Sequence, residues 1–450
     1  MLTRLSVFGF KTLVDVDLRL GPFTCIVGEN AVGKSNLFDA IRLLHLLAGH
    51  PIPEAVAHIR EARGRSVKPE DLFTGFGDVR IADEVRFAAE MVIPRTATDE
   101  FGVTAQASIT VLRYEVAFAL DDAGERLVLK EESLKPITLA SARKTFGSWA
   151  GKPFIESTVV GARHGGPFIS TEAGTIRLSQ DGHGGRQIPA AKSSRTVLSS
   201  VNADFPTALA ARREMESWAT LQLEPSAMRA PSLYADPKKI DERGAFLAGA
   251  LHRLEKARGR AALAEIVNRV AGLVPDVREL RVEDDPRQET LTAQIMGLDG
   301  AFRAARALSD GTLRFLVLAT LVADPEATGT LCVEEPENGI HPDRVGEMVR
   351  LLYDLAVDSA DGVSEENPLR QVLVNSHSPL VYNEVKVNDL VFLEFVDVVR
   401  GPTRGRSAVV RVPPSTWRAK TKDPVHLAVA PSRAAAWEQM SLRFRAADGR

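Results

Sequence analysis

One short motif limits the fold of this chain more than any other feature: Gly28-Glu29-Asn30-Ala31-Val32-Gly33-Lys34-Ser35. It follows the apolar run 23–27 and precedes the segment 37–47, whose apolar residues recur at helical spacing. A strand, a glycine-rich turn and a helix in this order are typical of a phosphate-binding loop. The alternative interpretation is a glycine-rich turn that only caps a helix.

The residue types in this motif suit nucleotide phosphates. Glycines let the backbone curl, so that its N–H groups and the following helix N-terminus point at phosphate oxygens. Lys34 is expected to neutralise the β and γ phosphates, and the hydroxyl of Ser35 is expected to bind Mg²⁺.

Two later apolar runs are predicted to be buried parallel strands that end in polar residues. The run 330–333 is followed by Glu334 and Glu335, whose side chains point in opposite directions in an extended strand. Glu334 is expected to hold Mg²⁺ through water, and Glu335 to orient and deprotonate an attacking water. The alternative is a solvated acidic pair at a strand end.

The second run, 371–374, is followed by His377, and Pro379 requires a turn there. His377 would be a hydrogen-bond donor near a γ-phosphate, unless its role is only structural. Ser309 can cap the apolar helix 313–321, and Gly311 leaves the backbone accessible to an anion. The alternative there is a simple helix cap.

Composition excludes several classes of protein. The 450 residues have a formal net charge of −3, so any site for a polyanion must be local. Cys25 and Cys332 lie in apolar runs and cannot form a disulfide framework or a zinc site. We expect a cytoplasmic protein, since the thiols fit a reducing compartment and no apolar run reaches the roughly 20 residues of a membrane span.

Four segments occur in a characteristic order: GENAVGKSN, LSDGTLR, CVEEPENGIHP and VNSHSP. They resemble the ABC-type ATPases of the SMC, RecF and OLD nuclease group, especially stand-alone bacterial ATPases, several of which are linked to phage defence. The resemblance implies ATP and Mg²⁺ as cofactors. It assigns residues 28–36, including Asn36, to Walker A, and Glu334 with Glu335 to Walker B. His377 becomes the switch histidine, and the remaining assignments are a signature of Ser309, Asp310, Gly311 and Thr312 and a D-loop of Asn338 and Gly339.

The implied fold is α/β: a P-loop ATPase head with a mainly parallel sheet flanked by helices, an antiparallel β lobe, and a large insertion between Walker A and the signature. We predict that residues 1–120 and 301–400 form the two halves of the head and that residues 121–300 form a lobe that is β-rich and then helical. Residues 401–450 are predicted to be a basic tail, since they hold ten basic and three acidic residues.

Some positions depart from the group's pattern, namely Asp310 and Thr312 in the signature and Glu334 in place of an aspartate. They affect the expected timing of hydrolysis more than nucleotide binding. The only glutamine between residues 50 and 120 is Gln106, which makes it the candidate for the Q-loop.

By this resemblance the chain is an ATPase that dimerises through ATP, with Walker A from one chain and the signature from the other. It would switch a separate effector, a nuclease or toxin, in antiphage defence. Residues after Pro379 are too few for a Toprim nuclease domain of roughly 100 residues. One alternative is a RecF-like ATPase that acts on DNA directly, which the basic tail favours. The other is a nucleotide-dependent scaffold without hydrolysis.

Two further expectations concern arrangement. The strand before His377 should lie between the Walker A and Walker B strands, which would keep Cys25 and Cys332 about 9–10 Å apart as free buried thiols. Residues 401–450 should be dispensable for ATP binding, because every predicted phosphate contact lies before residue 380.

Overall fold

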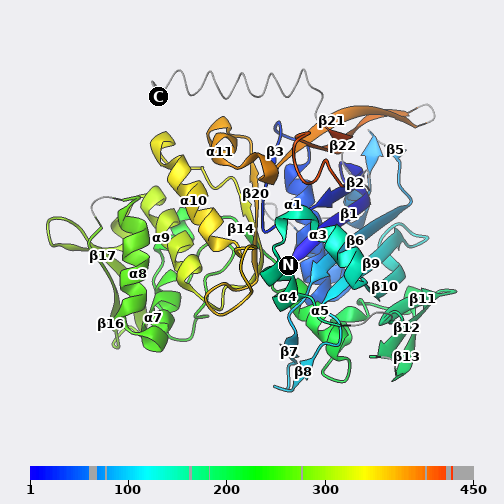
Figure 1. The fold of residues 1–450 in the computed structure, drawn as a ribbon, viewed down its shortest axis with the longest axis horizontal. Helices are drawn as coiled ribbons and strands as arrows, with labels where there is room; N and C mark the ends of the chain where they lie inside the picture. Colours follow the sequence, from blue (N-terminus) through cyan, green and yellow to red (C-terminus); the bar gives the residue numbers. More distant parts are fainter. Residues whose placement is uncertain are drawn as a thin grey trace.

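The computed structural model of the chain describes residues 1–59, 68–76, 79–161, 165–181, 183–274, 277–400, 403–421 and 427–428. Two lobes lie side by side, one built on large sheets and one mainly of helices, with strands β3, β20 and β14 between them (Figure 1). Within these ranges, no helix has the length and apolar character needed to cross a membrane.

A mainly parallel sheet forms the centre, in the order β14-β19-β20-β3-β21-β22-β23. Its strands are β14 (Ala219–Leu221), β19 (Gly329–Glu334), β20 (Arg370–Ser376), β3 (Phe23–Val27), β21 (Leu390–Arg400), β22 (Thr403–Val412) and β23 (Leu427–Ala428). The first five run parallel, and β22 pairs antiparallel with β21. The predicted strand order is confirmed, because β20 lies between β3 and β19.

Helices cover both faces of this sheet, which explains why every residue of β3 is buried. Ile26 belongs to the core formed with the antiparallel sheet and α1 (Lys34–Gly49). Cys25 and Val27 face the other core, which includes α9 (Asp310–Ala323) and α10 (Val345–Leu355). Cys25 and Cys332 are buried and free, as predicted.

An eight-stranded antiparallel sheet packs over α1 in the order β13-β12-β11-β10-β9-β6-β1-β2. Its strands are β13 (His183–Pro189), β12 (Thr175–Gln180), β11 (Ile169–Glu172), β10 (Leu127–Pro136), β9 (Val111–Leu120), β6 (Glu84–Val92), β1 (Leu2–Phe10) and β2 (Leu13–Arg19). β11 and β12 pair antiparallel with Glu172 opposite Thr175, so the chain turns between them.

The helical lobe packs a small sheet against its helices. It contains α6 (Pro225–Arg229), α7 (Leu247–Arg258), α8 (Arg260–Ala271), β15 (Ser232–Leu233), β16 (Glu279–Asp285), β17 (Thr290–Met296) and β18 (Phe302–Ala304). Helices also occur within the region predicted to be β-rich, namely α3 (Leu139–Phe146) and α4 (Lys152–Thr158). The remaining elements are α2 (Ile52–Ala57), α5 (Pro206–Glu216), α11 (Pro379–Glu384), β4 (Gly75–Phe76), β5 (Val79–Arg80), β7 (Thr96–Thr98), β8 (Thr104–Gln106) and seven short 3-10 turns.

Two predicted boundaries need correction. The boundary between residues 120 and 121 divides the antiparallel pair β9–β10, so both strands belong to one sheet. The predicted tail begins inside the core, since β22 pairs with β21 along its whole length and Arg418 is buried. The prediction weighed the basic residues of this segment above the apolar residues 408–410 and Val412 of β22. The other tail residues, 401–402, 422–426 and 429–450, lie outside the described residues.

Candidate functional site

The phosphate loop connects the carboxyl end of β3 to the first turn of α1. Two glycines are sterically required there. A Cβ at Gly28 would lie 2.5 Å from the carbonyl oxygen of Leu393, and one at Gly33 would lie 2.4 Å from Thr12 Oγ1. Gly33 also has a φ of 102°, which L side chains rarely adopt. The loop therefore depends on the glycines that define its motif.

Lys34 is held inside its own loop. Its Nζ donates hydrogen bonds to the carbonyl oxygens of Gly28 at 2.6 Å and Glu29 at 2.8 Å. Partial burial lowers the pKa of Lys34, while the carboxylates of Glu335 and Glu337 oppose that shift. The cation is thus placed at the loop, and no carboxylate of the described ranges forms an ion pair with it, so an incoming phosphate can bind it.

The other loop residues fill distinct positions. Ser35 lies half-buried in the first turn of α1. Asn36 donates to Thr12 Oγ1 at 2.8 Å, so its amide is engaged with the chain rather than directed at a ligand. Glu29, Asn30 and Ala31 lie at the rim, where Ala31 has a φ of 66°.

Glu334 ends β19 beside a glutamine that the sequence analysis missed. β14 runs parallel to β19 with Leu221 opposite Val333, which brings Gln222 next to Glu334. Gln222 Nε2 donates to Glu334 Oε2 at 2.9 Å. A cavity of about 680 Å³ lies beside this pair. Arg42 and Glu242, which form an ion pair, are among the residues that line it.

Gln222, rather than Gln106, is therefore the glutamine at the candidate metal site. Gln106 ends β8, on a separate two-stranded hairpin, where its amide oxygen can accept from Arg95. The segment before Gln222 is Ala219-Thr220-Leu221, which is too short and too mixed in polarity to predict a strand.

Glu335 directs its carboxylate at other partners. Its Oε1 lies 3.0 Å from His377 Nδ1, and its Oε2 accepts from Asn338 Nδ2 at 2.9 Å. Its backbone N–H donates to the carbonyl and side-chain oxygens of Asn375, and its φ of 42° is rare for a residue with a side chain. Strained backbone of this kind clusters at functional sites. The fold thus brings together Glu335, His377 and Asn338.

A second carboxylate, Glu337, lies in the same group and was not predicted. Its Oε1 accepts from Ser376 Oγ at 2.5 Å, and its Oε2 is buried with no hydrogen-bond partner in the described part of the chain. Burial raises its pKa, and the hydrogen bond from Ser376 opposes this. This carboxyl group therefore favours its protonated form more than a solvated glutamate would.

The signature segment begins α9 in the helical lobe. Ser309 Oγ accepts from the N–H of Thr312 at 3.2 Å and so caps the helix. Asp310 forms an ion pair with Arg229. A Cβ at Gly311 would lie 3.4 Å from the carbonyl oxygen of Gly339, so this turn contacts the D-loop segment. α9 packs in the core of the helical lobe, whereas α1 packs in the core of the antiparallel sheet (Figure 1).

The residues present fit Mg²⁺ and a nucleoside triphosphate. Ser35 and Glu334 offer a hydroxyl and a carboxylate, and Mg²⁺ in nucleotide sites takes few protein ligands besides phosphate oxygens and water. No group of three or more His, Cys, Asp or Glu side chains forms a metal site among the described residues.

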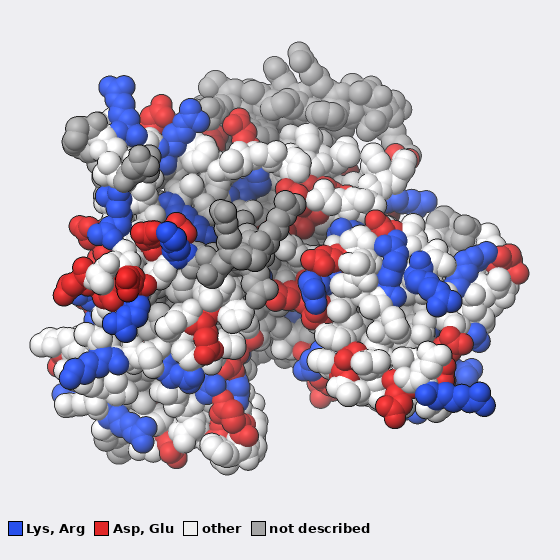
Figure 2. Space-filling view, turned by 180° about the vertical axis from the view of Figure 1, so that it is seen from behind, with Lys and Arg blue, Asp and Glu red and all other residues white. Residues whose placement is uncertain are grey.

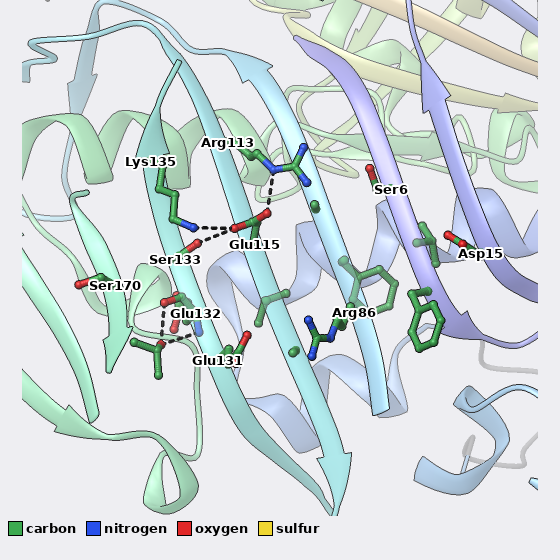
Figure 3. Close-up of a pocket in the computed structure, with 17 residues that line it drawn as sticks. Ser6, Asp15, Arg86, Arg113, Glu115, Glu131, Glu132, Ser133, Lys135 and Ser170 are labelled. Atoms are coloured by element: carbon green, nitrogen blue, oxygen red, sulfur yellow. Dashed lines mark hydrogen bonds and ion pairs between the residues drawn. The ribbon is translucent and has the colours of Figure 1, made fainter. Parts of the chain in front are cut away.

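A separate pocket of about 420 Å³ lies on the open face of the antiparallel sheet (Figure 3). Glu115 accepts there from Arg113 at 2.8 Å and from Lys135 at 3.0 Å. Partial burial would raise the pKa of Glu115, but these two cations outweigh it and lower the pKa to about 2. None of the predicted site residues lines this pocket.

Comparisons with known proteins match parts of the chain. The family described as "AAA domain, putative AbiEii toxin, Type IV TA system" matches residues 179–383. An OLD nuclease of Thermus scotoductus is 52% identical over 44 residues, which are 10% of this chain and 8% of that protein. The DNA replication and repair protein RecF of Paenarthrobacter aurescens is 36% identical over 75 residues, which are 16% of this chain and 19% of RecF. The chain thus matches less than a fifth of each relative's length.

Solved SMC heads are similar over most of their length but with low scores. The SMC head bound to the C-terminal winged-helix domain of ScpA is 15% identical, with a TM-score of 0.47, and the match covers 90% of this chain and 97% of that chain. The SMC head domain from Thermotoga maritima is 14% identical, with a TM-score of 0.39, over 92% and 98% of the two chains. In the family match and in these two relatives, the chain is similar to ATPases of the RecF and OLD type.

Proposed function

We propose that this chain binds and hydrolyses Mg-ATP at composite sites between two copies and thereby switches a separate effector protein. The observation that carries the proposal is the separation of the two half-sites. The loop with Lys34 begins α1, whereas the capped turn at Ser309 begins α9 in the other lobe. An interface that joins the first of these to the second on another copy would complete both sites symmetrically.

The contacts of these side chains support the following catalytic roles. Lys34 and the loop N–H groups would hold the phosphates, and Ser35 and Glu334 would hold Mg²⁺, which would neutralise the charge that develops on the phosphates. Glu335 accepts a proton from the attacking water, and His377, which contacts its Oε1, orients that carboxylate. Asn338 fixes the other carboxylate oxygen.

The test compares three variants by phosphate release and by light scattering with and without Mg-ATP. Glu335→Gln should slow hydrolysis by about 10²–10⁴-fold and accumulate an ATP-bound dimer, because the side chain keeps its size and loses its basicity. Lys34→Ala should lose both nucleotide and dimer. Ser309→Arg should bind ATP and stay monomeric, since its side chain would meet the partner's phosphate.

Glu172→Gln, an exposed carboxylate on β11, is the matched control and should behave like the unchanged chain. Hydrolysis at the unchanged rate in Glu335→Gln would exclude Glu335 as the base. An ATP-dependent dimer of Ser309→Arg would exclude the composite site.

The second candidate function is a RecF-like ATPase that acts directly on DNA, and the RecF match favours it. On the face shown in Figure 2, acidic and basic side chains are interspersed over the described residues of both lobes. DNA binding that weakens steeply with salt, measured by fluorescence anisotropy, would support this candidate. A chain shortened after Ala428 would test the basic residues that follow it without removing β22.

A further inference from the structure

The signature turn carries a charge that conflicts with the role proposed for it. Asp310 is the first residue of α9, directly after the cap Ser309, and its side chain is partly exposed. If this turn receives the partner's γ-phosphate, a free carboxylate there would repel it, because like charges placed together across an interface are strongly unfavourable. This inference rests on the proposed composite site.

Arg229 lies against this carboxylate. Its Nη2 donates to the carbonyl oxygen of Leu308 at 3.0 Å and forms an ion pair with Asp310 Oδ1. One guanidinium nitrogen therefore joins the residues on either side of Ser309. The contact neutralises Asp310 and at the same time fixes the backbone turn that presents the Ser309 hydroxyl.

The origin of Arg229 in the fold gives it a defined position. It ends the short helix α6, and the neighbouring Met228 is buried, where it lies close to Gly244. α6 begins three residues after Gln222, which contacts Glu334. The segment between Gln222 and Arg229 thus connects the candidate metal site to the signature turn of the same chain.

A second guanidinium lies one helical turn further along α9. Asp310 and Arg314 are four residues apart and so share a face of the helix. The Nε of Arg314 is buried without a hydrogen-bond partner in the described part of the chain, and a Cβ at Gly339 would lie 3.9 Å from it. The turn therefore combines one carboxylate with two cations, and its helix N-terminus adds further positive potential.

We propose that Arg229 is a positioning residue that neutralises Asp310 and holds residues 308–310 so that the signature turn can receive the γ-phosphate of a second copy. Arg229 acts through Asp310 and the backbone and does not touch the reacting atoms. Without the charge of Arg229, the carboxylate of Asp310 should face the γ-phosphate bound to the second copy. The phosphate loop of the same chain should still bind its own nucleotide.

The experiment is a double-mutant cycle with Mg-ATP as the probe. Arg229→Ala should lower ATP-dependent dimerisation, measured by light scattering, and ATP hydrolysis by at least about tenfold. The affinity of the monomer for a fluorescent ATP analogue should change by less than about twofold, because Lys34 and Ser35 are untouched. Arg229→Ala with Asp310→Asn should recover most of the lost dimerisation, since the repelling charge is gone. Arg229→Lys keeps the charge and should lose less than Arg229→Ala.

Salt and a control separate repulsion from a general structural defect. Raising the salt from 0.15 to 0.5 M should shrink the defect of Arg229→Ala, because a repulsion near the surface is screened. Arg287→Ala, an exposed arginine on the β16–β17 turn, should match the unchanged chain at both salt concentrations.

Each result is decisive. If the unchanged chain neither dimerises nor hydrolyses with Mg-ATP, the proposed function fails. If the unchanged chain dimerises and hydrolyses ATP, and Arg229→Ala does both to the same extent, Arg229 has no positioning role. If Arg229→Ala is defective and neither Asp310→Asn nor salt restores it, neutralisation of Asp310 is excluded. Thermal unfolding of each variant confirms that it is folded, and Arg229→Lys carries the comparison if Arg229→Ala does not fold.

Discussion

The phosphate loop and the carboxylate cluster lie at the same edge of the parallel sheet, yet they are assembled differently. Lys34 binds carbonyl oxygens only five and six residues before it in the chain. Glu335, in contrast, contacts His377 across 42 residues, and Glu334 contacts Gln222 across 112. The hydrogen bonds of Lys34 are therefore local, whereas the carboxylate cluster exists only once β14, β19 and β20 have paired.

This difference predicts which variants affect which half of the site. Changes outside the loop should alter nucleotide binding only by unfolding the protein. Changes at distant partners of the carboxylates should alter metal binding and hydrolysis in a protein that stays folded and binds ATP. The following predictions test this separation, beginning with the largest expected effect.

Arg418 supports the strand that leads into the loop. It is buried, and its guanidinium donates to the carbonyl oxygen of Arg19 at 2.8 Å, to Thr24 Oγ1 at 2.8 Å and to the carbonyl oxygen of Asn388. Arg418→Ala should lower the free energy of unfolding by about 3–5 kcal/mol, because three buried acceptors lose their donor. Urea unfolding measures this, with exposed Arg404→Ala as the control, which should change it by less than about 0.5 kcal/mol.

If the loop is built from adjacent residues, folded Arg418→Ala should bind ATP within about twofold of the unchanged chain. A large loss of ATP affinity in the folded variant would show that the loop depends on distant support. That result would remove the contrast between the two halves of the site.

Glu132 lies outside the candidate site and makes hydrogen bonds to residues that are far from it in the sequence. Its carboxylate is buried and accepts from the N–H groups of Val197 at 2.6 Å and Leu198 at 2.8 Å and from Tyr114. Burial raises its pKa from 4.5 to about 7, although these hydrogen bonds oppose the shift. Between these two pH values the folded state binds more protons than the unfolded state. The contribution of Glu132 is therefore fully present below pH ~4.5 and is lost as the pH rises through about 7.

As the pH rises through this range, the contribution of Glu132 to the free energy of unfolding should fall by about 3 kcal/mol in total. Glu132→Gln does not titrate, so the difference in stability between the unchanged chain and this variant should shrink from pH 5 to pH 8. Glu131→Gln, at an exposed position, is the matched control. Its free energy of unfolding should change with pH in the same way as that of the unchanged chain. Parallel curves for Glu132→Gln as well would contradict the raised pKa.

The same contrast explains what the sequence could reveal. The loop and the helices α1 and α9 follow from apolar runs and the glycine motif, the strand order was implied by the family resemblance, and the structure agrees with them. Gln222 was missed because its strand has three residues and its partner is far along the chain. The boundary at residue 401 was misplaced because the basic residues were weighed above the apolar residues 408–410 and Val412 of β22. Neither error could be corrected without knowledge of strand pairing.

Gln222 tests the carboxylate half directly. Its Nε2 orients Glu334, and loss of such a supporting hydrogen bond typically costs 10–100-fold in metal affinity or activity. Gln222→Ala should raise the Mg²⁺ concentration for half-maximal hydrolysis by about tenfold, with little change in binding of the ATP analogue. Gln106→Ala is the matched control on the β7–β8 hairpin and should change neither quantity. The reverse pattern would restore Gln106 as the glutamine of the site.

The smallest expected effect concerns the two thiols, which report on the strand order that brings both halves of the site together. Val374 of β20 pairs with Cys25, and Leu373 of the same strand pairs with Cys332, so one strand separates the cysteines. Burial raises the pKa of both thiols and keeps them out of solvent. A thiol reagent should therefore label neither in the folded protein at pH 8 and both in urea, with no disulfide in non-reducing mass spectrometry. Fast labelling of Cys25 alone would mean that β3 separates readily from β20, and the cluster would then depend on a weaker sheet than the loop beside it.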